Sequence, residues 1–139
     1  NNGRDKNLSP YAFTKSKNLE LLENLKKWFN FKYEVIFFYN VYGPRQNPIY
    51  VVSKSVYRVL NGISPELYDG GLQTRCFTYI DDVIDGIILA ATLDKAIGNI
   101  INLGNTIEST MSEVVNEVLC ASNSNLKITD IKTEERYKF

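Results

Sequence analysis

A short apolar stretch without polar alternation, Val35-Ile36-Phe37-Phe38, restricts the fold of this chain more than any other feature. A strand with one solvated face alternates apolar and polar residues, whereas a strand covered on both faces is continuously apolar. Strands of the second kind occur mainly in parallel sheets that carry helices on either side. The stretch, within the aromatic and β-branched segment 33–39, therefore predicts a buried strand of an α/β protein.

Helical and strand-like patterns alternate along the rest of the chain. Ser9 and Pro10 are typical first residues of a helix, and helical spacing of leucines extends it to Phe29. The further predicted elements are a helix from Pro48 to Leu60, strands at 66–68, 75–80, 99–103 and 126–131, a helix from Asp81 or Asp82, and a helix opened by the capping box Thr110-Met111-Ser112-Glu113. This order predicts an α/β fold with largely parallel strand pairing.

Apolar residues at helical spacing mark the faces that the helices are expected to bury. These residues are Leu19, Leu22, Leu25 and Phe29 in the first helix, Val52, Val56, Val59 and Leu60 in the second, and Val83, Ile87, Ala90 and Ala91 in the third. Lys54 and Arg58 fall on the outer face of the second helix and are expected to be solvated. Asp81 and Asp82 are assigned to helix capping rather than to chemistry, because carboxylates are common N-caps.

The 139 residues provide room for one domain, in which 16 Lys and Arg residues balance 16 Asp and Glu residues. No net charge therefore points to nucleic acid or to an anionic membrane. The sequence contains no histidine, which excludes Ser-His-Asp and Cys-His mechanisms and the commonest zinc ligand, so no metal site is predicted. Cys76 and Cys120 fit neither a disulfide framework nor a metal cluster, and no apolar run approaches ~18 residues. These features favour a cytoplasmic protein.

Tyr11 and Lys15 are the pair whose types and spacing suggest chemistry. At i and i+4 near the start of a helix, their Cβ atoms lie about 6 Å apart, so the ammonium can approach the phenol. A neighbouring cation favours the phenolate, and such a pair can serve as an acid–base unit. The alternative is an amphipathic ring at the edge of the core beside a solvated amine. The spacing alone leaves both interpretations open.

The predicted strand at 33–39 is followed by Asn40 and by the loop 41–48, which contains Gly and Pro. Loops at the carboxyl ends of buried parallel strands are where open α/β sheets bind ligands. Asn40 and Arg45 are therefore placed to contact a ligand, although turn formation and solvation also explain such residues. The sequence contains no Gly-x-Gly-x-x-Gly or Gly-x-x-Gly-x-x-Gly turn, so a dinucleotide pyrophosphate has no conventional cradle here.

Three separated stretches, Ser9–Lys15, Tyr39–Gln46 and Asp69–Asp82, share an order and rough spacing with one family. Together they resemble the extended short-chain dehydrogenase/reductases, specifically the NAD-dependent nucleotide-sugar epimerase/dehydratase group, which includes UDP-glucose 4-epimerases and UDP-glucuronate decarboxylases. The resemblance implies the C-terminal half of a Rossmann-like fold, with parallel strands and helices plus part of a small substrate-binding domain. As a single partial domain, residues 1–47 would end the nucleotide-binding core, and residues 48–139 would be mostly substrate-binding region with returning core elements.

The resemblance also implies roles at the cofactor. Tyr11 matches the catalytic tyrosine, which takes a proton from a sugar hydroxyl while hydride passes to the nicotinamide. Lys15 matches the lysine that binds the nicotinamide ribose and promotes ionisation of the tyrosine. The backbone of Phe38 and Tyr39 would lie beside the nicotinamide. The expected cofactor is NAD, with NADP also open.

At the substrate, Asn40 matches an asparagine that contacts the sugar nucleotide near its diphosphate, and Arg75 matches an arginine that reaches the diphosphate. Arg45 is expected to contact the substrate as well. The expected partner is a nucleotide-diphosphate sugar, in the first place a UDP-sugar, and the full-length enzyme is expected to form a homodimer. Cys76 stands where many relatives have aspartate, and Phe37 where relatives often have arginine.

Two functions remain after this comparison. The first is an NAD(P)-dependent nucleotide-sugar epimerase/dehydratase, an isomerase or lyase that acts on a sugar hydroxyl through a transient 4-keto intermediate. Epimerisation, dehydration and decarboxylation all stay open, as do the sugar and the base. The family's glycine-rich turn, ribose-binding acidic residue and catalytic Ser or Thr lie upstream of the tyrosine, so the isolated chain is expected to be an inactive fragment. The alternative is a non-catalytic remnant that binds nucleotide sugar weakly or acts as a dimerisation partner.

Overall fold

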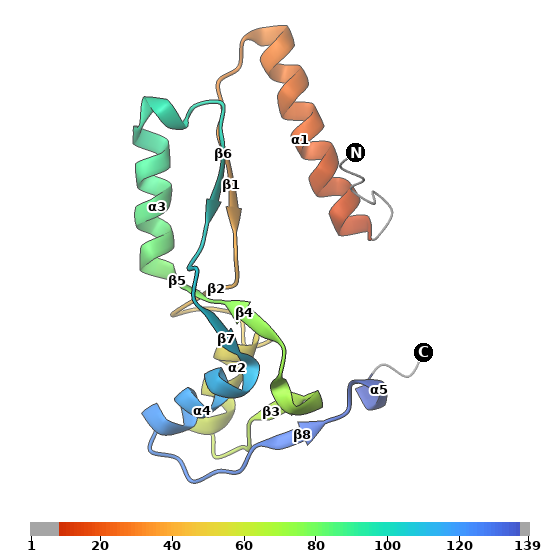
Figure 1. The fold of residues 1–139 in the computed structure, drawn as a ribbon, viewed down its shortest axis with the longest axis vertical. Helices are drawn as coiled ribbons and strands as arrows, with labels where there is room; N and C mark the ends of the chain where they lie inside the picture. The colour runs from red at the N-terminus through yellow and green to blue at the C-terminus, as the bar shows by residue number, and fades with distance from the viewer. Residues whose placement is uncertain (1–8, 137–139) are drawn as a thin grey trace.

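A computed structural model describes residues 9–136 of the chain (Figure 1). The polar residues 1–8 and the charged residues 132–139, which the sequence predicts to be a loop and a frayed tail, lie wholly or partly outside that range. Helices and strands alternate, which confirms the predicted α/β class. The elements are α1 (Pro10–Phe29), β1 (Val35–Phe38), β2 (Val41–Tyr42), α2 (Val51–Leu60), β3 (Glu66–Tyr68), η1 (Asp69–Gly71), β4 (Thr74–Cys76), β5 (Thr78–Tyr79), α3 (Ile80–Thr92), η2 (Asp94–Ala96), β6 (Ile100–Leu103), β7 (Glu108–Thr110), α4 (Met111–Ala121), β8 (Thr129–Ile131) and α5 (Thr133–Arg136).

The strands form pairs, most of them parallel. β1 pairs with β6 from Val35 opposite Ile100 to Phe38 opposite Leu103. β2 pairs with β5 and β3 with β8, both in parallel, whereas β4 and β7 are antiparallel. The predicted parallel character is confirmed, and the sequence did not predict β2 or β7 as strands.

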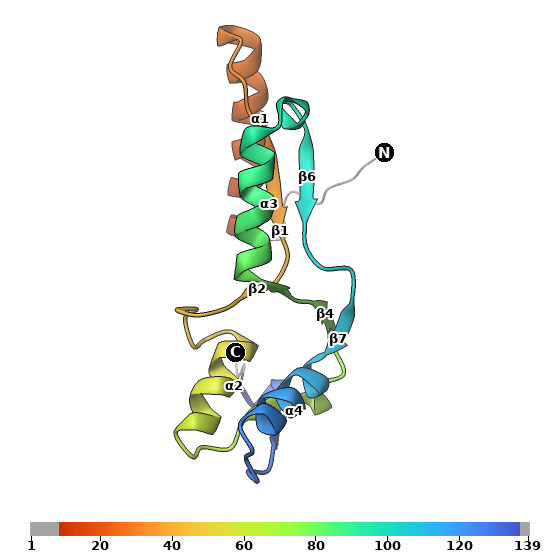
Figure 2. The ribbon, with the colours of Figure 1, turned by 90° about the vertical axis from the view of Figure 1, so that its left-hand side faces the viewer.

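The molecule is elongated, and its two ends have different architectures. At one end α1 and α3 lie on either side of the β1–β6 ribbon (Figures 1 and 2). α3 approaches β6 closely at Gly86, where an added Cβ would lie 2.3 Å from Cδ1 of Leu103. At the other end α2 packs against α4, and β3 pairs with β8 beside them. The β4–β7 pair connects the two ends, so residues of this pair and of β2 and β5 lie between them.

Only some of the residues predicted to form the buried faces of the helices are buried. Val59, Val83 and Ala90 are buried, and so is Val115 in α4. The prediction is wrong for Leu60, the last residue of α2, which is 72% exposed, and also for Val56, Ile87 and Ala91, which are exposed as well.

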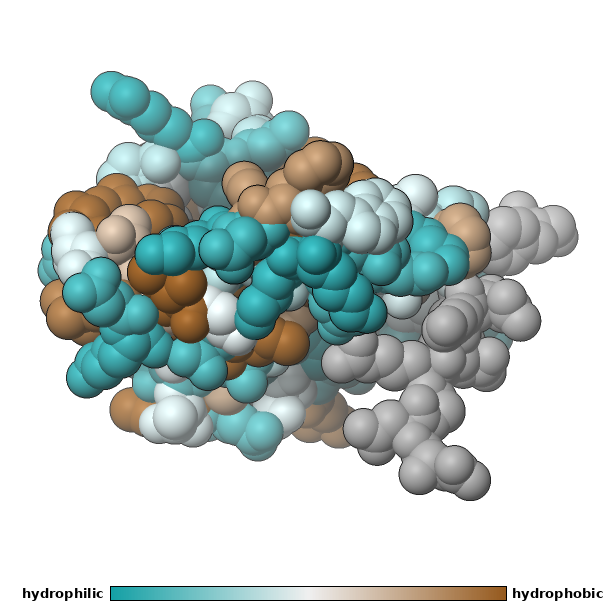
Figure 3. Space-filling model, turned by 90° about the horizontal axis from the view of Figure 1, so that it is seen from above, coloured by the Kyte–Doolittle hydropathy of each residue, from teal (hydrophilic) through white to brown (hydrophobic). Residues whose placement is uncertain are grey.

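The predicted buried face of α1 is wrong for the part of the chain that the structure describes. No residue of α1 is buried, and Phe29 is 71% exposed. The reason is that the face has little to pack against, since the helix stands apart from the strand ribbon (Figure 1). Seen from above, apolar side chains reach the surface among hydrophilic ones at this end of the molecule (Figure 3).

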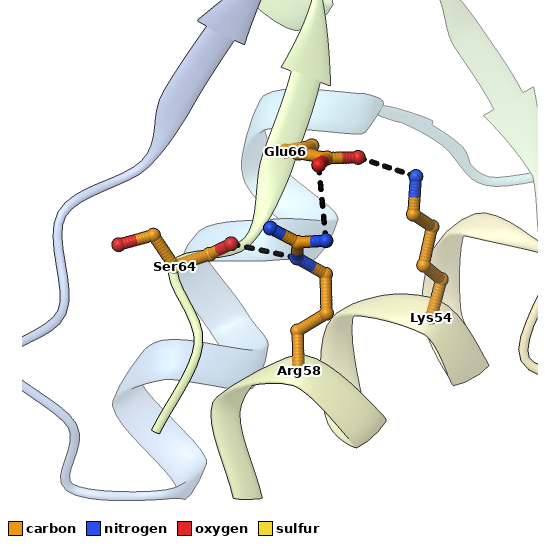
Figure 4. A network of polar contacts seen from close by, with 4 residues as sticks. All are labelled: Lys54, Arg58, Ser64 and Glu66. Carbon is orange, nitrogen blue, oxygen red and sulfur yellow. Dashed lines mark hydrogen bonds and ion pairs between the residues drawn. The ribbon is translucent and has the colours of Figure 1, made fainter. Parts of the chain in front are cut away.

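Lys54 and Arg58 are not solvated as the sequence suggested. Both point from α2 toward Glu66 at the start of β3 (Figure 4). Lys54 Nζ lies 2.5 Å from Oε2 of Glu66, and Arg58 Nη1 lies 3.0 Å from Oε1. Arg58 Nε also donates to the carbonyl of Ser64 at 2.7 Å. All three ionic side chains are at most 25% exposed, so this face of α2 is an interface with β3.

The helix starts follow the sequence for α1 and α4 and depart from it for α2 and α3. α2 begins at Val51, with Tyr50 as its N-cap, rather than at Pro48. Ser9 caps α1, and Thr110 with Glu113 forms the predicted capping box of α4. α3 instead begins at Ile80 with Tyr79 as its N-cap, and no side chain caps it. Asp81 and Asp82 therefore lie inside the first turn, where carboxylates interact favourably with the helix dipole. No helix among residues 9–136 is long and apolar enough to cross a membrane.

Candidate functional site

The first turns of α1 carry Tyr11 and Lys15 in the predicted arrangement. The Ser9 hydroxyl accepts a hydrogen bond from the backbone N–H of Ala12 at 3.1 Å, and Pro10 is the first helical residue. Lys15 Nζ lies 5.6 Å from the centroid of the Tyr11 ring, within the range of a cation–π contact. Tyr11 is 72% exposed, so both polar groups are accessible.

The direction of α1 places this pair at one edge of the strand ribbon. α1 runs antiparallel to β1, so its first turns lie toward the carboxyl ends of β1 and β6 (Figures 1 and 2). This is the edge at which parallel α/β sheets bind ligands.

Phe38 ends β1 at this edge, and Tyr39 follows it. Phe38 is 51% exposed and Tyr39 is 45% exposed. The Tyr39 hydroxyl donates to Oδ1 of Asn102 on the neighbouring β6 at 3.0 Å. The chain that follows β6 comes close at Gly104, where an added Cβ would lie 3.2 Å from Cβ of Tyr39. The two strand ends are therefore joined by side-chain contacts as well as by backbone pairing.

Asn40 and Arg75 are distant in sequence and line the same cavity, of about 140 Å³. Asn40 has a left-handed φ of 39°, and its side-chain N–H donates to the carbonyl of Cys76 at 3.2 Å. Arg75 is exposed, and its Nη1 donates to the carbonyl of Thr74 at 2.6 Å. One amide and one guanidinium thus meet at a single hollow, a combination suited to an anionic ligand.

Arg45 lies in a neighbouring hollow rather than in the same one. With a left-handed φ of 68°, it lines a space of about 220 Å³ together with Gly43, Pro44 and Ile80. Gln46 lines both hollows, and its Nε2 donates to the carbonyl of Val41 at 2.6 Å. The structure therefore brings Asn40 and Arg75 to one hollow, and Arg45, within the 41–46 turn, lines another.

The turn before β4 is fixed by groups from the end of the chain. Gly70 N–H donates to Oδ1 of Asp130 at 2.8 Å, and Thr133 donates from its hydroxyl and its backbone N–H to the Asp69 carboxylate. These hydrogen bonds, led by the one from the Thr133 hydroxyl, lower the pKa of Asp69 below its ordinary value of 3.8. The turn is thereby held in place ahead of Arg75.

Sequence reasoning did not identify Gln46 or Thr78 as site residues. Thr78 is 6% exposed, and its Oγ1 accepts from the Asn105 N–H at 2.9 Å. A threonine in an extended segment is unremarkable in a sequence, so only its burial and partners indicate a role. Among residues 9–136, no group of three or more Cys, Asp or Glu side chains is arranged to hold a metal ion.

Comparison with known proteins gives one family. Residues 1–104 match the NAD dependent epimerase/dehydratase family. A UDP-N-acetyl-alpha-D-glucosaminuronate decarboxylase of Bacillus cytotoxicus is 33% identical over 106 residues, which are 74% of this chain and 33% of that protein. A UDP-glucuronate 4-epimerase of Thermodesulfobacterium geofontis is 38% identical over 105 residues, which are 72% of this chain and 30% of that protein.

Solved structures of the same kind share the fold. A UDP-glucose 4-epimerase of Thermotoga maritima with UDP-glucose superposes with a TM-score of 0.83 at 26% identity, covering 90% of this chain and 41% of that one. A UDP-glucuronic acid 4-epimerase of Bacillus cereus with UDP-glucuronic acid and NAD gives 0.81 at 30% identity, covering 90% and 40%. The chain belongs to the NAD-dependent epimerase/dehydratase family and has part of its Rossmann-like, extended short-chain dehydrogenase fold. It spans about a third of the length of these curated relatives.

Proposed function

We propose that this chain is the distal portion of an NAD-dependent enzyme that oxidises a hydroxyl of a nucleotide sugar, with Tyr11 as its acid–base group. The observation that supports this most is the Tyr11–Lys15 contact of 5.6 Å, at the strand edge where Asn40 and Arg75 line one cavity. Within the chain, residues 1–47 belong to the nucleotide-binding core and residues 48–139 mostly to the substrate-binding region. Relatives with this fold were solved with NAD or with a UDP-sugar.

The chain's own residues supply the proton transfer and the nicotinamide end of the cofactor site. Tyr11 takes the proton of the sugar hydroxyl as the general base, and the Lys15 ammonium, whose nitrogen lies 5.6 Å from the centroid of the Tyr11 ring, binds the ribose hydroxyls. Phe38 and Tyr39, which are exposed at the end of β1 and directly after it, would lie beside the nicotinamide. NAD bound there would supply the acceptor for the hydride that leaves the carbon bearing the hydroxyl.

The substrate end of the site binds the diphosphate. The Arg75 guanidinium offers a fork of donors to phosphate oxygens, and the Asn40 amide lines the same cavity. Arg45, which lines the neighbouring hollow, contacts another part of the substrate. UDP-sugars are the proposed substrate class because several relatives are named after a UDP-sugar.

The reaction proceeds through a transient 4-keto sugar, after which the hydride returns to the sugar. The oxidation is the step shared by the family, and the fate of the ketone differs among the relatives, which include decarboxylases, epimerases and dehydratases. We further propose that the whole enzyme is a homodimer in the cytoplasm, where the free thiols of Cys76 and Cys120 stay reduced.

Adding an upstream nucleotide-binding half tests this proposal. The corresponding half of the Bacillus cereus UDP-glucuronic acid 4-epimerase is joined to this chain or mixed with it, and turnover of UDP-glucuronic acid is followed. We expect turnover from the combination and none from either half alone. Folded combinations that bind NAD and the UDP-sugar without any turnover would contradict an enzymatic role for the chain.

The second candidate is a non-catalytic remnant that binds nucleotide sugar weakly or pairs with another copy. It is favoured by the absence of a glycine-rich dinucleotide turn from the sequence and by the exposed α1. Calorimetric titration of the isolated chain with NAD and with UDP-glucose separates the candidates. Tight NAD binding by the isolated chain would contradict the remnant.

A further inference from the structure

Thr78 on β5 is one of two buried polar residues in the part of the chain that the structure describes, at 6% exposure. Its hydroxyl donates to the carbonyl of Tyr39 at 3.3 Å and accepts from the N–H of Asn105 at 2.9 Å. Its backbone N–H donates to the carbonyl of Asn40 at 3.3 Å. One residue therefore joins the segment after β1 to the segment after β6.

These contacts hold Asn40 in an uncommon conformation. A φ of 39° is left-handed, a region that residues other than glycine enter at a cost and that asparagine tolerates better than most. The Asn40 carbonyl is fixed by the Thr78 N–H, and its side chain is fixed by the carbonyl of Cys76. The conformation thus depends on segment 76–78 on both sides of the residue.

The same segment also determines where Arg75 lies. Arg75 directly precedes Cys76 in the sequence. Phe77, which lies between Cys76 and Thr78, lines the cavity shared by Asn40 and Arg75. The distance between the amide and the guanidinium in the cavity is therefore set by how segment 76–78 is anchored. The buried Thr78 hydroxyl is the side-chain group that anchors it to Tyr39 and Asn105.

We infer that Thr78 is a positioning residue of the nucleotide-sugar site, which holds Asn40 and Arg75 at the separation that a diphosphate requires. This inference rests on the proposed function. Without the hydroxyl, the Asn105 N–H and the Tyr39 carbonyl lose a buried partner, and the left-handed turn at Asn40 loses its support.

The test compares two substitutions that differ at the hydroxyl. Thr78→Val keeps the shape and removes the hydroxyl, whereas Thr78→Ser keeps the hydroxyl and removes a methyl group. Each variant of the full 139-residue chain is titrated with UDP-glucose. We expect Thr78→Val to weaken binding about tenfold and Thr78→Ser to stay within about twofold of the parent.

A destabilised control separates positioning from folding stability. Val115→Ala truncates a side chain that is 0% exposed in α4 and lies outside the Asn40–Arg75 cavity. It is expected to lower the melting temperature and leave the affinity for UDP-glucose within about twofold. Equal affinities of Thr78→Val and the parent would overturn the inference, and so would a loss in Val115→Ala or Thr78→Ser as large as that in Thr78→Val.

Nuclear magnetic resonance gives a readout that does not need the ligand. In Thr78→Val the Asn105 amide should exchange faster with solvent, and the side-chain NH₂ signals of Asn40 should shift, with both restored in Thr78→Ser. Unchanged Asn40 signals in Thr78→Val overturn the inference. If the isolated parent chain does not bind UDP-glucose, the titrations are made on the protein joined to the upstream half, whose turnover decides the proposed function, while these signals decide the role of Thr78 in either case. If Thr78→Val does not fold, Thr78→Ala replaces it, and parent-like Asn40 signals there overturn the inference.

Discussion

The position of Tyr11 depends on a helix cap formed by Ser9, two residues before it in the sequence. Ser9 accepts a hydrogen bond from Ala12, and the Ser9 carbonyl accepts one from the N–H of Phe13 at 3.0 Å. The turn that presents Tyr11 and Lys15 is therefore held by its own first residue. This part of the site can be predicted from the sequence, because both the cap and the i,i+4 spacing act within one helix.

Ser9→Ala tests this dependence. The substitution should destabilise the first turn of α1 by about 1 kcal/mol and accelerate hydrogen exchange at Ala12, measured by nuclear magnetic resonance. Ser16→Ala, in the interior of the same helix, should preserve or raise protection because alanine has the higher helix propensity. Equal exchange at Ala12 in Ser9→Ala and the parent would show that the cap does not hold the turn.

Arg75 and Arg45 can be distinguished by their cavities. Arg75 shares its cavity with Asn40, and Arg45 lines the neighbouring one. Arg75→Met should therefore weaken UDP-glucose binding by about tenfold or more, and Arg45→Met by about threefold or less, in calorimetric titrations. The reverse order would place the diphosphate in the Arg45 hollow.

At the scale of elements, a helix or strand could be predicted from the sequence when the residues that stabilise it lie within it, and not when they belong to another element. The helices α1 and α4 carry their caps in their own sequence, and β1 has its continuous apolar run. β2 has only two residues and exists through its pairing with β5, so no local pattern marks it. Lys54 and Arg58 were assigned to solvent because their partner, Glu66, comes from another element.

The Lys54–Glu66–Arg58 cluster should contribute to the packing of α2 on β3. Glu66→Gln leaves two cations in a partly buried place, so we expect a loss of about 1–2 kcal/mol of unfolding free energy, smaller than for a fully buried pair. Urea denaturation measures it. Glu20→Gln, which removes the exposed partner of Lys17 in α1, is the control and should cost less than about 0.5 kcal/mol. Similar losses for the two variants would contradict a structural role of the cluster.

The α4 capping box predicts a pH dependence. Hydrogen bonds from the backbone N–H and the hydroxyl of Thr110 lower the pKa of Glu113 below its ordinary value of 4.5. A depressed pKa means that the stabilisation is complete above pH 4.5 and is lost as pH falls through the lower, folded-state value. The melting temperature of Glu113→Gln should therefore lie below that of the parent near neutral pH, and the gap should close in acid. A gap that is independent of pH would exclude the carboxylate as its source.

At the scale of the whole molecule, the apolar surface is distributed as in part of a larger fold. α1 has no buried residue, the end of β1 is exposed, and the family relatives are more than twice as long as the chain. The fold class was predictable because helical and strand-like residue patterns alternate along the sequence. The burial of α1 was not, because burial depends on what packs against the helix.

The central claim is that Tyr11 carries the proton transfer. It is tested by single-turnover NADH formation from UDP-glucuronic acid in the joined protein, comparing Tyr11→Phe with Tyr57→Phe, which changes an exposed tyrosine on α2. We predict that Tyr11→Phe slows hydride transfer by about 10²–10⁴-fold with UDP-sugar affinity retained, and that Tyr57→Phe keeps the parent rate. A parent-like rate in Tyr11→Phe would contradict the account.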